Sequence, residues 1–456
     1  MINKKPNILE VNGITLILDK NDYVGRAAID INIAVGSTNE PDGKRGISHV
    51  LEHMIFQGSE LRNIDDYTKI FDSYGADING FTTYDFTAYT LSVLSEYITQ
   101  TLDVLMDLVC NPKFDPELLE KEKKVILEEM NQELDDNDSY LGLCIFYKIC
   151  EGTDYQIPII GKRKDIESIT VEDLKSYHSR YYAKPNIVVS VSGNFNTDEI
   201  IAFFNSHSFN EPLPEFTKSN IHPGKINDHY HLPKGSKTQL LIPGDFNQSL
   251  IAMGNICPKF NSNTSALTTI ASMIFGGGIS SRLFLNVRNK NGYCYQIYNT
   301  SSKLNHIGSV VTVAYVNTEY VDEAINVILN EYEKFYNDGI TIEEFNNAVL
   351  NYKYSWIKSM ESIDRCVARN SRQILFKGKE NFQTIQDKIE DIDKITIDDV
   401  NKYIREYYNP ENLHIMLLQN HQPLKRTDGW KGYKLDNREG KTNPYYVPWL
   451  DPKELR

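Results

Sequence analysis

Two histidines and a glutamate stand close together in the segment His49-Val50-Leu51-Glu52-His53. Apolar residues recur there at helical spacing, which predicts a helix with one buried face: Ile47, Val50, Leu51, Met54 and Ile55. That face lies opposite His49, Glu52 and His53. Histidines four residues apart sit on neighbouring turns, so the pair can share one zinc ion while the carboxylate between them reaches a water molecule. A solvated polar face that happens to contain two histidines would give the same pattern.

A second predicted helix begins at Asp115-Pro116, a cap residue followed by proline at the first helical position. Its inward stripe consists of Leu118, Leu119, Val125 and Ile126. Glu122 and Glu129 fall on the same stripe, where a carboxylate is costly unless it is paired or bound to a metal. We therefore expect Glu129 to be the third zinc ligand and Glu122 a supporting carboxylate nearby. The alternative is two glutamates at the edge of a helix, each reaching out to solvent. The neighbouring charges are expected to be solvated: Glu120, Lys121, Lys123, Lys124 and Glu128.

An internal repeat divides the chain. Residues 169–174 and 395–400 share a pattern of a capping threonine and a helix start, each followed by a double tyrosine and an apolar strand, at an offset of 226. Residues 53–56 and 272–275 repeat at an offset of 219. With that offset the second copy has Thr268, Ala271 and Ser272 in place of His49, Glu52 and His53, so we expect one metal ion per chain.

Each half mixes strands of period two with long amphipathic helices, which predicts the α+β class. We expect two homologous halves, each with a mainly antiparallel sheet and helices packed on it. The predicted division is a zinc-binding half at 1–210, a Pro/Gly-rich linker at 211–237, a second half without zinc ligands at 238–420 and an extension at 421–456.

The motifs together resemble the inverzincins of the insulinase-like, or pitrilysin, peptidase family, whose HxxEH motif is followed by a glutamate about 76 residues beyond the second histidine. Glu129 stands at that distance from His53, and Glu122 matches a further family glutamate seven residues earlier. The resemblance covers about residues 10–420. By size and two-half organisation, the chain most resembles the branch of mitochondrial processing peptidases and their bacterial relatives.

The same resemblance implies further site residues. A glycine-rich stretch at 276–278 precedes Arg288 and Tyr295, which match the arginine and tyrosine that family members use to bind substrate and stabilise the oxyanion. Asn79, Gly80 and Phe81 begin a segment like the family's Asn-Ala-x-Thr edge strand, to which substrate peptides add as an extra strand. The alternative for that segment is a plain sheet strand.

Composition and charge bear on which partners and which cellular compartment we expect for the protein. The 456-residue chain has a formal net charge of −14, which argues against sequence-independent nucleic-acid binding. It has no apolar run long enough to span a membrane and no apolar segment after its first lysines, so we expect neither membrane insertion nor a secretory signal. Its six cysteines form no CxxC pair, which predicts reduced thiols in a cytoplasmic protein.

These observations predict a zinc metalloendopeptidase. It would cleave unfolded peptides or precursor and leader segments, with Glu52 as general base and with Arg288, Tyr295 and Glu122 completing the catalytic set. Two alternatives remain at this stage: an inactive family member that serves as an assembly or regulatory subunit, and a metal-dependent hydrolase acting on something other than peptides. By resemblance, we expect the partner to be a second copy of the chain or a related chain.

Overall fold

The computed structural model describes residues 4–212, 238–244, 248–260 and 264–420. The predicted extension at 421–456 and nearly all of the predicted linker lie outside these residues. The chain forms two compact units, each with its own sheet. The first unit comprises Met1–Glu129, Ile157–Lys225 and Ser355–Ile389, and the second comprises Met130–Gln156, Ile226–Tyr354 and Glu390–Arg456.

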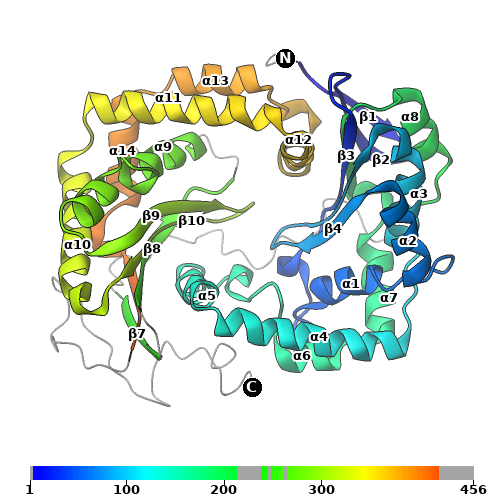
Figure 1. The fold of residues 1–456 in the computed structure, drawn as a ribbon, viewed down its shortest axis with the longest axis horizontal. Coiled ribbons are helices and arrows are strands. Elements are labelled where there is room, and N and C mark those ends of the chain that lie inside the picture. The colour runs from blue at the N-terminus through cyan, green and yellow to red at the C-terminus, as the bar shows by residue number, and fades with distance from the viewer. Residues whose placement is uncertain (1–3, 213–237, 245–247, 261–263, 421–456) are drawn as a thin grey trace. The chain divides into compact units, whose positions relative to one another are not determined.

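The sheet of the first unit has six strands in the order β1-β2-β6-β3-β5-β4, in which only the β2/β6 pair is parallel. Figure 1 labels β1, β2, β3 and β4 of this sheet. The strands are β1 (Asn7–Val11), β2 (Ile14–Lys20), β3 (Arg26–Ile33), β4 (Asp77–Thr82), β5 (Thr87–Leu94) and β6 (Ile187–Gly193). The helices that lie wholly or mostly in this unit are α1 (Ile47–Ile55), α2 (Ile64–Tyr74), α3 (Ile98–Cys110), α4 (Pro116–Asp135), α6 (Arg163–Ser168), α7 (Val171–Tyr181), α8 (Thr197–Ser206), α12 (Ile363–Lys377) and α13 (Ile385–Asp393). Strand β4 is an edge of the sheet, as predicted for the segment that contains Asn79 to Phe81.

The sheet of the second unit has the order β7-β11-β8-β10-β9, again with a single parallel pair, β7/β11. The strands are β7 (Thr238–Gly244), β8 (Ser249–Cys257), β9 (Cys294–Lys303), β10 (Gly308–Val316) and β11 (His414–Asn420). The helices that lie wholly or mostly in this unit are α5 (Asn137–Ile149), α9 (Ser265–Gly276), α10 (Val321–Asp338), α11 (Ile342–Lys358) and α14 (Ile397–Tyr407). Strand for strand, this order repeats the first sheet without β1. The α+β class and the two homologous halves are therefore confirmed.

The repeated threonine caps form as predicted. Thr170 and Thr396 each accept a hydrogen bond from the backbone of the aspartate three residues later, and that aspartate bonds back to the cap. Helices α7 and α14 consequently begin at equivalent positions, and each is followed by a central strand, β6 or β11.

The two halves exchange one helix, which the sequence did not predict. Helices α5 and α12 begin 226 residues apart, at Asn137 and Ile363, so they are copies of each other. Helix α5 comes from the first half of the chain but packs on β8 and β11, whereas α12 comes from the second half and packs on β3 and β6. The predicted boundaries of the halves remain a prediction, because the compact units are built from the exchanged segments.

No helix in the described ranges is both long and apolar enough to cross a membrane. All six cysteines lie in the described residues, and all are buried free thiols.

Candidate metal centre

Helix α1 is fixed at its start by a carboxylate from outside the helix. Its cap, Gly46, has φ 101°, and an added Cβ would lie 2.6 Å from the Ile160 carbonyl oxygen, so glycine is required there. The backbone N–H groups of Gly46 and Ser48 donate to the two carboxylate oxygens of Glu40 at 2.7 and 2.9 Å. Burial raises the pKa of Glu40 to about 7, although these two hydrogen bonds act to lower it. A remote carboxylate thus satisfies amides that no side chain of the helix itself caps.

The remainder of α1 is as predicted. Its apolar stripe is fully buried: Ile47, Val50, Leu51, Met54 and Ile55. The opposite face presents His49, Glu52 and His53, of which the Glu52 side chain is the most deeply buried.

Three side chains converge where zinc was expected. The Nε2 atoms of His49 and His53 lie 3.8 and 3.5 Å from Glu129 Oε2. Possible ligand atoms of these three residues all lie within 4.8 Å of one another. In the described part of the chain, no other group of three His, Cys, Asp or Glu residues meets that criterion. The packing of α4 near α1 therefore brings Glu129 close to His53, although the two residues are 76 positions apart in the sequence.

Glu122 supports this group from the side. Its Oε2 atom lies 3.2 Å from His53 Nδ1, and its side chain is almost fully buried. A carboxylate at Nδ1 favours a proton on that nitrogen and leaves Nε2 free to bind a metal. The structure places Glu122 beside a ligand rather than among the three converging groups, as predicted.

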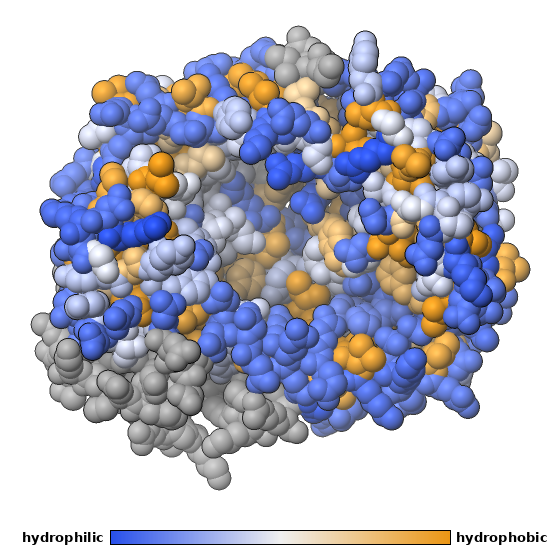
Figure 2. Space-filling model, in the orientation of Figure 1, coloured by the Kyte–Doolittle hydropathy of each residue, from blue (hydrophilic) through white to orange (hydrophobic). Residues whose placement is uncertain are grey.

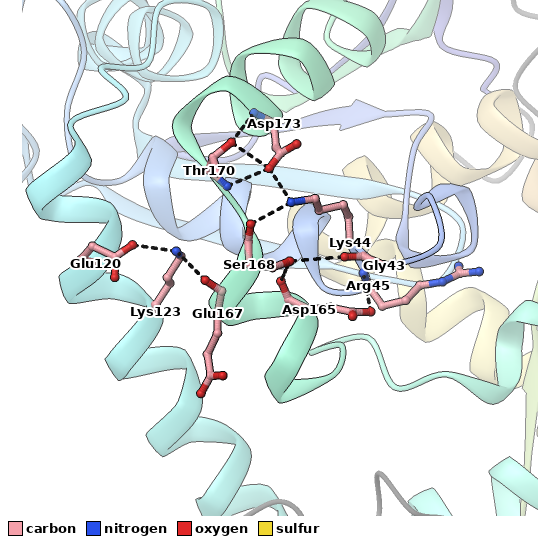
Figure 3. Close-up of polar contacts among 10 residues, drawn as sticks. All are labelled: Gly43, Lys44, Arg45, Glu120, Lys123, Asp165, Glu167, Ser168, Thr170 and Asp173. Atoms are coloured by element: carbon pink, nitrogen blue, oxygen red, sulfur yellow. Dashed lines mark hydrogen bonds and ion pairs between the residues drawn. The ribbon is translucent and has the colours of Figure 1, made fainter.

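Helix α4 differs from its predicted face in three positions. Val125 is exposed, and Glu129 keeps about half of its side-chain surface open, so neither belongs to a buried stripe. Lys123, expected to be solvated, is 6% exposed and donates to Glu120 and to the carbonyl oxygen of Glu167 (Figure 3). The other expected surface charges are exposed: Glu120, Lys121, Lys124 and Glu128. Figure 2 shows a mainly hydrophilic surface along α4, with a few hydrophobic residues.

Helix α6 and the start of α7 lie between α4 and the turn before α1 and bond to both (Figure 3). One of these bonds satisfies the buried Lys123. Lys123 reaches the end of α6 from α4, at 3.1 Å from the Glu167 carbonyl oxygen. From the turn before α1, Lys44 donates to the Ser168 carbonyl oxygen at 2.8 Å and to Asp173 at 2.7 Å. The backbone N–H of Arg45 donates to Asp165 at 3.2 Å. These bonds set the separation of the two helices that carry the metal-binding side chains.

The electrostatics of the three converging residues suit a cation. Burial lowers the pKa of His49 to about 4, and the neighbouring His53 adds to that effect, so His49 is a neutral imidazole at neutral pH. Burial also lowers the pKa of His53, but hydrogen bonds to Glu129 and Glu122 outweigh it and raise the pKa overall. The hydrogen bond from His53 holds the pKa of Glu129 below its usual value. A metal ion and a proton would compete for the same atoms of His53 and Glu129.

The donor set fits zinc. Two imidazole nitrogens and one carboxylate oxygen are a known ligand combination for catalytic zinc sites, which keep a fourth position for water or substrate. Glu52 lies among these groups but is not one of the three. Its buried carboxylate accepts a hydrogen bond of 2.7 Å from the Thr82 hydroxyl, and its pKa is raised by burial.

Strand β4 runs alongside α1 at this point. A Cβ added at Gly80 would lie 2.6 Å from the Phe56 ring and 3.2 Å from Glu52 Cγ, so the helix approaches the strand as closely as glycine allows. Thr82, the last residue of β4, orients Glu52, and sequence reasoning had left it without a role. Its place in the edge-strand motif was the available signal. No motif in the sequence indicated the role of Glu40 as the cap of α1, because the path of a loop brings this residue to the start of the helix.

Arg288 and Tyr295 lie in the second unit, on η6 (Phe284–Asn289) and on β9 respectively. The structure brings the two together: the Arg288 guanidinium carbon lies 5.2 Å from the centre of the Tyr295 ring and 4.6 Å from that of Phe284. The Tyr295 side chain is 76% exposed. The guanidinium is thus stacked on an exposed aromatic ring. The roles of the two residues in substrate binding and oxyanion stabilisation stay predictions.

The second copy has no metal-binding side chains at the equivalent positions. Helix α9 carries Thr268, Ala271 and Ser272, all buried. Ser272 donates to the Asn299 side chain at 2.7 Å. The copy of α4 is α11, where the 226 offset places Ala348 at the position of Glu122. Hydroxyl and methyl groups thus stand where the first copy has imidazoles and carboxylates.

Comparison with known proteins agrees with this arrangement. Residues 15–143 match the sequence profile of insulinase (peptidase family M16), and residues 168–352 match that of the peptidase M16 inactive domain. A zinc protease of Rickettsia bellii is 31% identical over 310 residues, covering 68% of this chain and 72% of that protein. The chain belongs to peptidase family M16. The first profile covers His49, His53 and Glu129, and the second covers α9, the copy of α1 that lacks metal-binding side chains.

Two further comparisons extend along the whole described fold. The Bacillus subtilis zinc protease YmxG is 27% identical over 408 residues, which cover 88% of this chain and 95% of that protein. A protease from Helicobacter pylori superposes with a TM-score of 0.80 at 22% identity, covering 91% of this chain and 100% of that one. The fold of this M16 protein is therefore shared over nearly its full described length.

Proposed function

We propose that the protein is a zinc-dependent metalloendopeptidase that cleaves unfolded peptides or precursor and leader segments. The observation that carries this proposal is the convergence of His49, His53 and Glu129 within 4.8 Å beside the buried carboxylate of Glu52. The names of the relatives support zinc as the metal. We propose one zinc ion per chain, which the single converging group in the described residues supports.

When bound, zinc supplies Lewis acidity, which brings the pKa of a water molecule toward neutrality and polarises a carbonyl oxygen. Glu52 then acts as general base. Its buried carboxylate takes a proton from the attacking water and gives it to the leaving amine nitrogen, and a pKa raised by burial suits a group that must both accept and release a proton. The Thr82 hydrogen bond holds that carboxylate in place, and Glu122 holds His53.

The substrate is proposed to be an extended peptide that pairs with the free edge of β4. Asn79, Gly80 and Phe81 would provide backbone hydrogen bonds to it, because an edge strand presents unpaired N–H and C=O groups. The close approach of α1 to Gly80 supports this placement, since a peptide along β4 passes the residue that contacts Glu52. Arg288 is proposed to bind the substrate backbone and Tyr295 to stabilise the oxyanion, as the family resemblance implies.

The competing proposal is an inactive assembly or regulatory subunit. It is disfavoured because the groups needed for catalysis are not only present but brought together: three converging ligands, an oriented ligand imidazole and a buried base. A hydrolase acting on another class of substrate would have the same metal centre. It would differ from a peptidase in that its substrate would not pair with the edge of β4.

The active unit is proposed to contain two chains, identical or related, and to act in the cytoplasm. Resemblance supports the first point, and the six buried free thiols support a reducing compartment. Light scattering combined with a peptidase assay tests the first. A monomer with full activity at nanomolar concentration would show that one chain suffices.

The deciding experiment compares Glu52→Gln with Glu128→Gln. Both remove one carboxylate charge, but Glu128 is exposed on α4 and lies outside the converging group. Glu52→Gln should keep its zinc and its fold and lose nearly all turnover of an unfolded peptide, because an amide cannot accept the proton. Glu128→Gln should retain activity. Turnover near the wild-type value in zinc-loaded Glu52→Gln protein would remove Glu52 as the base.

A further inference from the structure

A cavity lies in the first unit, apart from the residues of the metal centre. Its volume is about 250 Å³, and it is bounded by the ends of β2 and β6, by α12 and by the segment that follows α12. None of its lining residues belongs to the metal centre or to the proposed substrate edge. Pockets for drug-sized ligands begin at about 300 Å³, so this cavity suits a smaller molecule, of the size of one amino-acid residue with a short acyl group.

Part of the cavity lining is charged. Arg369, on α12, donates to Ser359 Oγ at 3.3 Å and to Asn370 Oδ1 at 3.4 Å. Both acceptors are neutral, and in the described ranges no carboxylate forms an ion pair with Arg369. A guanidinium without an ion-pair partner among the described residues therefore lines the cavity.

The other charged groups that line the cavity neutralise one another. Asp19 lies 3.6 Å from Lys4 and also accepts from Asn370 at 3.2 Å. Asp22 lies 3.1 Å from Lys20. Arg369 is left as a net positive charge in a chain whose formal net charge is −14. The Cys366 thiol also lines the cavity, and burial raises its pKa, so it adds no negative charge at neutral pH.

Other parts of the lining are apolar. Ile363, Phe382 and Ile385 are at most 9% exposed, and Met360 also lines the cavity. A lining that combines a guanidinium with apolar side chains selects a molecule that has an aliphatic body and one carboxylate.

We propose that this cavity binds a small monocarboxylate with an apolar side chain, with its carboxylate on Arg369 and its body against the apolar side chains of the lining. Such a group occurs at the C-terminus of a peptide that ends in an apolar residue and in a free apolar amino acid. The ligand joins β6 to α12, the helix that the second half of the chain contributes to this unit. It therefore strengthens the attachment of the exchanged helix, independently of the metal centre.

The test is isothermal titration calorimetry on the full chain at two temperatures, so that a binding enthalpy near zero at one of them does not hide binding. The probes are N-acetyl-L-leucine, L-leucine and N-acetyl-L-leucinamide, the last of which lacks the carboxylate. The acetylated acid should bind saturably and the amide should not. Equal binding of free leucine would identify an amino acid as the ligand, whereas binding of the acetylated acid alone would identify a peptide C-terminus.

Variants locate the binding. Arg369→Gln should weaken the affinity for N-acetyl-L-leucine on the order of tenfold or more, because it removes a charge-assisted hydrogen bond. Arg372→Gln is the matched control, since Arg372 is an exposed arginine of the same helix outside the cavity. His49→Ala should leave the affinity unchanged, which separates this cavity from carboxylate binding at the metal centre. The proposal fails if no acid binds, if the amide binds as tightly as the acid, or if Arg369→Gln and Arg372→Gln have equal affinities.

Discussion

Replacing Glu122 tests how the metal centre is held. Its Oε2 atom is 3.2 Å from His53 Nδ1, and its side chain is nearly buried. A hydrogen bond to a charged group contributes about 1.5–3 kcal/mol, and a neutral one about 0.5–1.5 kcal/mol. Glu122→Ala loses the whole interaction, so zinc affinity should fall on the order of 10–100-fold, which also matches the usual effect of losing such a partner. Glu122→Gln keeps a neutral acceptor and should lose roughly 5–15-fold.

The assay is competition for zinc with a chromophoric chelator at neutral pH, with circular dichroism to confirm that each variant is folded. Glu128→Gln serves as the control, since it removes a charge from the exposed side of the same helix. Activity at saturating zinc should return in both Glu122 variants, because the ligands and Glu52 remain. A Glu122→Ala affinity within about twofold of that control would refute the supporting role. A loss as complete as that of His53→Ala would instead make Glu122 a ligand.

Three further predictions concern other parts of the molecule. Tyr295→Phe should keep zinc and the apparent substrate affinity while kcat falls on the order of 10²–10³-fold, the usual loss of one oxyanion donor; unchanged kcat in a stable, zinc-loaded variant would reject that role. Burial lowers the pKa of His178 to about 4 from 6.5. The unfolded chain therefore binds a proton at His178 more tightly than the folded chain does. The free energy of unfolding should be unaffected by His178 above pH 6.5 and should fall by roughly 3 kcal/mol as the pH drops toward 4, measured by urea denaturation. His178→Gln should flatten that pH dependence, and an unaltered slope would contradict the reasoning. Gly46→Ala should lower the free energy of unfolding by about 1–3 kcal/mol, because φ is 101° and the Ile160 carbonyl blocks a Cβ; a melting temperature equal to that of the wild type would count against it.

The sequence by itself determined the features that depend on local periodicity. A helix repeats every 3.6 residues, so the spacing of apolar residues around His49, Glu52 and His53 was enough to place these three on the face away from the core. The threonine caps of α7 and α14 were also readable, because a cap and its aspartate lie three residues apart in the chain. The offset of 226 between the copies revealed the duplication in the same way.

Features that depend on distant partners were decided only by the tertiary structure. Periodicity put Glu129 and Val125 on a buried stripe, but the solvent boundary of α4 depends on what packs against it, and both are exposed. Lys123 looked like a surface charge, yet α6 supplies a carbonyl oxygen that satisfies it when buried.

The exchange of α5 and α12 has the same origin. Two copies of one amphipathic helix have similar patterns of apolar residues. The sequence of neither copy predicts which sheet it will cover. The choice depends on how the connections reach each sheet and on which apolar surface is left uncovered there, and both are properties of the folded chain.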